Sequence, residues 1–197
     1  MVFPFYVYVY ILFWFLKPEG EGCTCSPSVR QDPQTSYRYD AKYETDFSKY
    51  SEHAGIISSE TVRSWEKLYH NTAIKIFDKS SRMKNTPEDS IYLFKGYIYS
   101  AKMNKHDCDL HLEIGIEDPA ALRTVAEISK NNCKLQESII QQLRSRDFVL
   151  GKKNQNVIKC VIKGLGFYDG KHPLKENKKY EQGSAWEIHP VLSIELE

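Results

Sequence analysis

Ser90-Ile-Tyr-Leu-Phe-Lys-Gly-Tyr-Ile-Tyr-Ser100 is the stretch of sequence that decides the fold. It is long and rich in β-branched and aromatic residues, and this composition is typical of a β-strand. Its interior glycine, Gly96, predicts a bulge or a sharp bend, because glycine inside a strand often marks such a distortion. The sequence therefore predicts one long, bent strand from which the rest of the domain is built.

The residues that follow predict four more strands and one helix. After the first strand, apolar and polar residues alternate through residues 109–116, which is the period-two pattern of a half-buried strand. A shorter strand is expected at 123–129. Apolar residues then recur at helical spacing from 134 to 148, and Gly151 closes the segment shortly after. Two further strands are expected at 157–168 and 184–196.

Three strands, a helix and two strands form the order of an OB-fold, a five-stranded Greek-key barrel. The first strand of such a barrel has to curve to serve both halves of it, and Gly96 suits that need. We therefore predict a mainly β protein with one or two helices, in which an OB-like β-β-β-α-β-β barrel at 89–197 follows a helical segment at 59–88. In that segment Ser59 or Thr61 caps a helix that contains Val62 and Trp65.

The N-terminal segment predicts export. Residues 2–16 carry no charge, and this run is short for a bilayer-spanning helix of about 20 residues but fits the apolar region of a secretory signal. Gly20 and Gly22 precede Cys23 where a signal peptidase requires small residues. We predict a signal peptide or N-terminal anchor at 1–22, a flexible tether at 23–58, and a periplasmic, surface or secreted location. A lipid-modified Cys23, and with it a membrane tether, is the alternative.

Charge and cysteine content narrow the classes of function. The chain has 27 basic and 26 acidic residues, a net charge of +1, which excludes a strongly basic nucleic-acid binder. In an exported protein Cys108, Cys133 and Cys160 could supply one disulfide and leave one thiol, and the sequence does not fix the pairing. Cys23 and Cys25 are too close together for a structural zinc pair.

Acidic and histidine side chains gather at the expected strand ends. The second strand is opened by an Asp-rich turn, and its face opposite the leucines carries the acids and a histidine. The candidate ligand-binding residues are Asp107, Asp109, His111, Glu127, Asp169 and His172. The candidate catalytic residues are His111, Glu127, Glu187 and His189.

These motifs resemble a family of exported bacterial proteins without an assigned reaction. The resemblance rests on Asp-x-Asp-x-His-Leu at 107–112, Ala-Glu-Ile at 126–128, Gly-x-Gly-Phe-Tyr-Asp-x-x-His at 164–172 and Glu-Ile-His-Pro-Val at 187–191. It implies the same set of site positions, with Glu187 and His189 included, and no mechanism. Cys108 departs from the pattern, because a histidine is expected between the two aspartates.

Two kinds of chemistry suit such a cluster. A divalent metal cofactor could be held by Asp109, His111 and Glu127, with Glu187 as another possible carboxylate ligand, and would acidify a bound water. Without a metal, His111 or His189 could move a proton while a carboxylate fixes its tautomer. His111 and Glu127 fall on adjoining strands, so the right register would make them neighbours.

We favour a ligand-binding module in the cell envelope that recognises a polysaccharide, a peptide or a nucleic acid. For a nucleic acid, late lysine-rich loops could hold the phosphates while aromatic residues stack on the bases; the stacking candidates are Tyr97, Tyr99, Phe167 and Tyr168. A metal-dependent hydrolase of the phosphodiesterase or nuclease type and a purely structural domain stay open as alternatives. The sequence names neither the ligand nor the oligomeric state.

Overall fold

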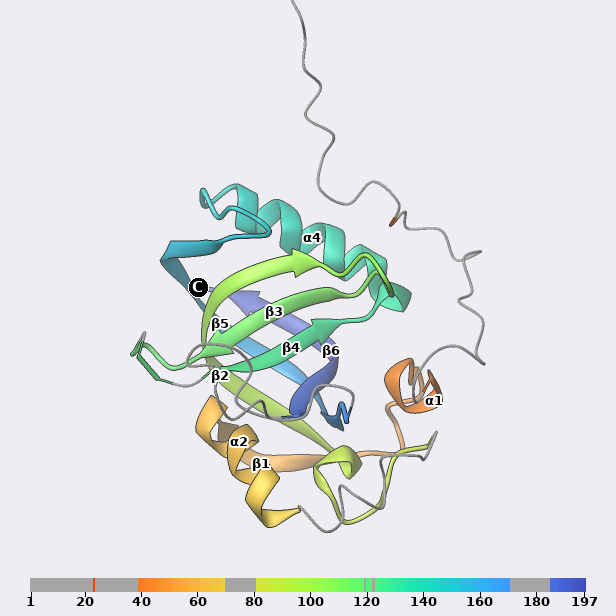
Figure 1. The fold of residues 1–197 in the computed structure, drawn as a ribbon. Coiled ribbons are helices and arrows are strands. Elements are labelled where there is room, and N and C mark those ends of the chain that lie inside the picture. The colour runs from red at the N-terminus through yellow and green to blue at the C-terminus, as the bar shows by residue number, and fades with distance from the viewer. Residues whose placement is uncertain (1–22, 24–38, 70–80, 119, 122, 171–184) are drawn as a thin grey trace, which may run out of the picture.

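The computed structural model describes residues 23, 39–69, 81–118, 120–121, 123–170 and 185–197. Within these residues, one sheet of six strands runs in the order β1-β2-β3-β4-β6-β5 and closes where β2 also pairs with β5 (Figure 1). The closed part has five strands: β2 (Ser90–Met103), β3 (Leu110–Gly115), β4 (Thr124–Ile128), β5 (Lys153–Tyr168) and β6 (Trp186–Leu196).

This strand order confirms the predicted OB-like barrel. β2 is antiparallel to both β3 and β5, and β4 runs parallel to β6. The last barrel strand, β6, therefore lies between β4 and β5, which are the third and fourth strands of the barrel. The helix α4 (Cys133–Arg144) lies between β4 and β5 in the chain, as predicted, and buries Ile139 and Leu143. Each strand lies within a few residues of the predicted range.

The first barrel strand distorts three residues later than predicted. The register of β2 against both β3 and β5 shifts between Ile98 and Ser100, whereas Gly96 pairs regularly with Cys160. Gly96 is required for another reason: a Cβ atom there would collide with the carbonyl oxygen of Gly115 and with the ring of Phe94. The glycine therefore allows a close approach to the end of β3, and the bulge lies beside it.

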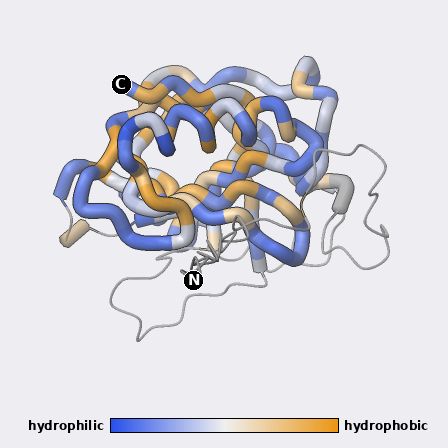
Figure 2. Tube along the Cα trace, turned by 90° about the horizontal axis from the view of Figure 1, so that it is seen from above, coloured by the Kyte–Doolittle hydropathy of each residue, from blue (hydrophilic) through white to orange (hydrophobic). Residues whose placement is uncertain are grey.

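The barrel interior is apolar. Hydrophobic and hydrophilic residues alternate along the strands (Figure 2), as expected for strands with one face turned to a core. The inward side chains are completely buried, among them Phe94, Ile98, Leu112 and Ile162. At the side of the barrel, α2 (Ser59–Leu68) packs Val62 and Trp65 against it. The rings of Trp65 and Trp186 meet edge-on, with 5.9 Å between their centres.

The region before the barrel differs from the prediction. The described part of the expected tether contains α1 (Tyr39–Lys42) and β1 (Ser51–Ile57), and β1 pairs parallel to β2. Only the last residue of β1 is buried, so the strand depends on backbone pairing and carries no apolar alternation that a sequence pattern could detect. The expected helical extension contains α2, whose N-cap is Ser58 and not the predicted Ser59 or Thr61. Residues 1–22 and 70–80 lie outside the described residues.

No helix among the described residues is both long enough and apolar enough to cross a bilayer.

Candidate functional site

The candidate site lies on the outer face of β3, β4 and β6. Along these strands the leucines and isoleucines face the barrel interior, so the residues between them face outward. His111 of β3 is directly opposite Glu127 of β4 in the register, and β6 runs beside β4 with Glu187 and His189 on the same side. The strand pairing therefore brings side chains from distant parts of the sequence onto one surface.

Glu127 is at the centre of this group. Its Oε1 lies 2.9 Å from Nδ1 of His111, and its Oε2 lies 3.0 Å from Nδ1 of His189. An ionised carboxylate can only accept hydrogen bonds, so both imidazoles donate from Nδ1. Nδ1 of His189 is also 3.3 Å from Oε1 of Glu187. The two carboxylates thus fix the orientation of both rings.

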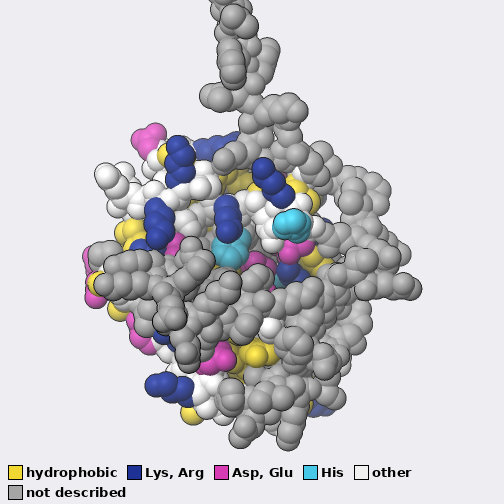
Figure 3. All heavy atoms as spheres, in the orientation of Figure 1, with side chains coloured by type: hydrophobic (Ala, Val, Ile, Leu, Met, Phe, Trp, Pro, Cys, Tyr) yellow, Lys and Arg dark blue, Asp and Glu magenta, His cyan; other side chains and the backbone are white. Residues whose placement is uncertain are grey.

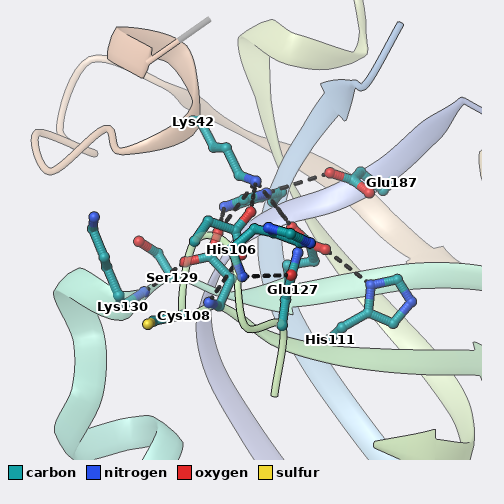
Figure 4. Close-up of polar contacts among 12 residues, drawn as sticks. Lys42, His106, Cys108, His111, Glu127, Ser129, Lys130 and Glu187 are labelled. Atoms are coloured by element: carbon teal, nitrogen blue, oxygen red, sulfur yellow. Dashed lines mark hydrogen bonds and ion pairs between the residues drawn. The ribbon is translucent and has the colours of Figure 1, made fainter. Parts of the chain in front are cut away.

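Lys42 reaches the group from outside the barrel. It is the last residue of α1, and its ammonium points toward the carboxylates from the side opposite the strands (Figure 4). Nζ lies 2.7 Å from Oδ2 of Asp107, 3.4 Å from Oδ2 of Asp109 and 3.6 Å from Oε2 of Glu127. One cation therefore contacts three carboxylates that come from the β2–β3 turn and from β4.

The turn between β2 and β3 holds the two aspartates in place. Cys108 has a left-handed backbone conformation with φ 62°, and Oδ1 of Asp107 accepts a hydrogen bond from the amide of Asp109. Oδ1 of Asp109 accepts another from the amide of Lys130, at 2.8 Å. Asp109 is completely buried, so this turn places a carboxylate between the strands and the 129–132 segment.

A disulfide joins this turn to the N-terminal segment. Cys108 is bonded to Cys23, 85 residues earlier, and Cys133 is also disulfide-bonded. The predicted single disulfide among Cys108, Cys133 and Cys160 is therefore wrong, because Cys23 is held against the β2–β3 turn and does not lead away from the domain as a tether would. Among the described cysteines, Cys160 is the free thiol; it is buried in the barrel wall, where burial raises its pKa to about 12.

Burial and charge act in opposite directions on the acids of the cluster. Burial raises the pKa of Asp109 to about 6, although His189 and Lys42 oppose the shift. Burial acts in the same direction on Glu127, but hydrogen bonds from His111 and His189 outweigh it and hold its pKa well below the usual range. Glu127 is therefore the ionised centre of the group, and Asp109 is the acid at which burial outweighs the neighbouring positive charges.

The same balance acts on Lys42. Burial disfavours its charge, but the attraction of Glu127, Asp109 and Asp107 is larger and raises its pKa above the usual value. Lys42 therefore carries a positive charge at neutral pH.

A groove of about 610 Å³ opens beside the cluster. His111, Glu127 and Glu187 form one wall of it, and basic and acidic side chains are mixed on the face where it lies (Figure 3). The other lining residues come from β2 and β3, from the turn at 104–106, from residues 151–153 where β5 begins, and from the residue that follows β5: Ser100, Ala101, Lys102, Asn104, His106, Glu113, Gly151, Lys152, Lys153 and Asp169.

Most of the predicted site residues come together. Asp107, Asp109, His111, Glu127, Glu187 and His189 form the one cluster described above, which we call the outer-face cluster. Asp169 lines the groove without being part of these contacts, and His172 lies outside the described residues.

The metal-binding geometry differs from the predicted set in one ligand. The ligand atoms of Asp109, Glu127 and His189 all lie within 4.8 Å of one another, so His189 takes the place predicted for His111. The His111 ring instead contacts Oε1 of Glu127, on the other side of the carboxylate group.

The stacking prediction does not hold for two of its aromatic residues. Tyr99 and Phe167 are 3% and 1% exposed, and the half-buried ring of Tyr168 packs on Trp186. None of the described tyrosine, phenylalanine or tryptophan side chains lines the groove. A platform for unpaired bases is therefore not present at this groove.

Lys42 is the principal site residue that the sequence did not indicate. It lies in Asp-Ala-Lys-Tyr at 40–43, a stretch with no motif and no apolar period. Tyr43 beside it is buried, with Nζ of Lys130 5.1 Å from its ring centre. Only the return of the N-terminal segment onto the barrel makes this lysine a neighbour of the acids.

Comparisons of the chain with known protein families, with curated proteins and with solved structures find no significant match. The fold and the outer-face cluster therefore carry the functional argument.

Proposed function

We propose that this protein is an exported OB-like domain that binds a polar ligand in the groove beside the outer-face cluster. The observation that carries the proposal is the groove of about 610 Å³, whose wall is made by His111, Glu127 and Glu187. Pockets of about 300–1,000 Å³ are typical of ligand sites. The groove offers fixed hydrogen-bonding groups, because the side chains behind its wall are held by buried partners.

The position of the groove agrees with how OB-folds bind. In that fold, the face of the second and third strands and the loop between the first two strands take up oligosaccharides and oligonucleotides. Here these parts are β3, β4 and the β2–β3 turn, which supply His111, Glu127 and His106 to the groove. This is an argument from the fold alone, and it supports the location of a binding site without naming the ligand.

The lining of the groove favours a polysaccharide or a peptide over a nucleic acid. Lysines 102, 152 and 153 are mixed with Glu113, Asp169 and Glu187, so there is no uniformly positive surface for phosphates. Stacking side chains are absent from the described lining. A ligand with both hydrogen-bond donors and acceptors fits this mixture better than a polyanion does.

Export is supported by the leader pattern and by the cysteines. Disulfides persist in oxidising compartments and are rare in the cytosol, and Cys23 is bonded to Cys108. A sulfur atom in a disulfide has no valence left for a thioether to a lipid, so the disulfide favours release from the membrane over a lipid anchor at Cys23. The resemblance to exported bacterial proteins is in line with this proposal.

The test is a binding screen with the full chain. A thermal-shift panel of cell-wall glycans, short peptides and single-stranded oligonucleotides is followed by titration of any hit. We expect a glycan or a peptide to bind in the presence of a chelator, and His111→Ala to weaken it about tenfold or more. Glu137→Ala, an exposed change on α4, is the matched control and should bind like the wild type. Equal binding by His111→Ala would contradict the proposal.

A metal-dependent hydrolase is the second candidate, and the grouping of Asp109, Glu127 and His189 favours it. It requires turnover of a phosphodiester such as bis(p-nitrophenyl) phosphate with added Mn²⁺ or Zn²⁺. The turnover should be lost with chelator and in Asp109→Asn. If the cluster is only structural, the same substitutions should lower the melting temperature by several degrees and leave binding unchanged.

A further inference from the structure

Two buried atoms of the outer-face cluster lack hydrogen bonds although they face each other. Nε2 of His189 and Oδ2 of Asp109 are 3.7 Å apart, on side chains that are 0% exposed. Neither atom has a hydrogen-bond partner among the described residues. Buried polar atoms are almost always hydrogen-bonded, so an exception of this kind requires an explanation.

The protonation of His189 makes the pair more unusual. Nδ1 faces the carboxylates of Glu127 and Glu187, at 3.0 and 3.3 Å, and must donate to them. In a neutral ring Nε2 then carries a lone pair, which points toward a carboxylate oxygen. Two acceptors in this position repel each other unless a cation lies between them. A direct charged hydrogen bond is not formed, because 3.7 Å is too long for one.

The spacing of these atoms suits a metal ion. Zinc and similar ions bind nitrogen and oxygen ligands at about 2.0–2.2 Å, which separates neighbouring ligand atoms by about 3–4 Å. The distance between Nε2 of His189 and Oδ2 of Asp109 falls in this range, and one ligand atom from each of Asp109, Glu127 and His189 lies within 4.8 Å of the other two. A metal-bound histidine usually donates its other ring nitrogen to a carboxylate, as Nδ1 of His189 does here to Glu187.

The charges of the cluster are not balanced by Lys42. Among the described residues, Asp107, Asp109 and Glu127 all contact Lys42, so with neutral imidazoles one positive charge faces three negative ones there. Lys42 makes its hydrogen bond with Asp107, at 2.7 Å, and is farther from Asp109 and Glu127. The excess negative charge is therefore concentrated on Asp109 and Glu127, which both contact His189.

We propose that Asp109, Glu127 and His189 bind a divalent first-row transition metal of the Zn²⁺ or Mn²⁺ class. One imidazole and two carboxylates form a mixed nitrogen and oxygen donor set, whereas Mg²⁺ and Ca²⁺ prefer oxygen ligands alone. Three protein ligands leave coordination positions open for water or a ligand. Glu127 also lines the groove, so the metal site adjoins it. The metal site goes beyond the proposed ligand binding and does not depend on it.

The test is calorimetric titration of the chelator-treated full chain, disulfides intact, with Zn²⁺, Mn²⁺ and Mg²⁺ chlorides. We expect about one equivalent of Zn²⁺ or Mn²⁺ to bind more tightly than Mg²⁺. Asp109→Asn and His189→Gln should each weaken binding by about tenfold or more, since even outer-shell changes cost that much. His53→Gln changes an exposed histidine of β1 outside the cluster and the groove and should bind like the wild type. No binding by the wild type, or equal binding by Asp109→Asn, would overturn the proposal.

A second readout does not require the variants to fold. In the ¹⁵N-labelled wild type, Zn²⁺ should shift the Nε2 resonance of His189 while Nδ1 keeps its proton. An unchanged Nε2 resonance at saturating Zn²⁺ would overturn the proposal. Since no groove ligand is added in either experiment, failure of the metal site and failure of the proposed ligand binding are observed separately.

Discussion

The two faces of the same three strands differ in chemistry although both are buried. Inside the barrel, β3, β4 and β6 present Leu112, Ile128 and Ile188 to an apolar core. Outside it, neighbouring residues of these strands present Glu127 and His189, which are 6% and 0% exposed. The inner face is buried by barrel closure. The outer face is covered in part by Lys42 of the N-terminal segment and by the β2–β3 turn.

This difference between the faces indicates that the outer-face cluster has a function. Burying apolar area stabilises the fold by about 25 cal/mol per Å². Burying charges costs desolvation energy, and replacing a buried ion pair with apolar residues is often neutral or stabilising. A stable barrel of this size does not require such a cluster on its wall. The ionic outer layer is therefore better explained by binding than by stability.

The largest effect is expected from removing the central cation. Lys42→Met leaves Asp107, Asp109 and Glu127 without their shared partner, so we expect a loss of about 3–5 kcal/mol in the free energy of unfolding without added metal. Denaturant unfolding at neutral pH measures it. Lys134→Met on the exposed face of α4 is the control and should stay within about 0.5 kcal/mol of the wild type. A loss below about 1 kcal/mol for Lys42→Met would mean that the outer face is not held by this lysine.

The same substitution should act oppositely on metal binding. Lys42 keeps a positive charge 3.4 Å from Oδ2 of Asp109, so its removal takes away a competing charge and leaves all three proposed ligands in place. Lys42→Met should bind Zn²⁺ more tightly than the wild type in the calorimetric titration. Weaker binding would indicate that Lys42 organises the metal site instead of competing with it.

A core substitution tests the inner face of the strands separately from the outer face. Leu112→Ala removes a completely buried side chain and should cost about 2–5 kcal/mol in the free energy of unfolding. Because the folded variant keeps the outer face intact, its affinity for the groove ligand should not change. His111→Ala, on the adjacent position of β3, should show the reverse pattern, with weakened binding and a smaller loss of stability. If both variants changed binding alike, the two faces would not be separable.

The inner and outer faces differ in how much of each could be predicted from the sequence. The inner face follows from local patterns: the alternation at 110–116 and the helical spacing at 134–148 gave five strands, one helix and their order correctly. The outer acids and histidines were also found, because the same alternation places them opposite the leucines. Their partner Lys42, the strand β1 and the Cys23–Cys108 disulfide depend on how the N-terminal segment returns to the barrel, and no local pattern encodes that.

The disulfide tests how the outer face is covered, because it joins the N-terminal segment to the turn that carries Asp107 and Asp109. It spans 85 residues, so replacing both cysteines, Cys23→Ala with Cys108→Ala, should cost about 2–4 kcal/mol. Thermal unfolding under non-reducing conditions measures it, and the groove face should lose affinity along with stability if the segment shifts. An unchanged melting temperature would show that the segment is held without the bond.

The smallest effect is expected at the periphery of the N-terminal segment. Burial opposes ionisation of Glu44, but hydrogen bonds from Lys49, Tyr50 and nearby amides outweigh it and lower its pKa to about 2. Its contribution is present above the unfolded pKa of 4.5 and is lost as the pH falls toward 2. Glu44→Gln should therefore cost about 1 kcal/mol or less at pH 6 and nothing near pH 2. A constant difference across this range would contradict the ion pair.

The most direct test of the central claim, that Lys42 and acids from separate strands form one buried cluster, is a double-mutant cycle between Lys42 and Glu127. Their charged atoms are 3.6 Å apart and 85 residues separate them along the chain. Denaturant unfolding of Lys42→Met, Glu127→Gln and the double variant should give a coupling energy of about 1–3 kcal/mol. Additive effects within about 0.5 kcal/mol would show that the two side chains do not interact, and the account of the outer face would be wrong.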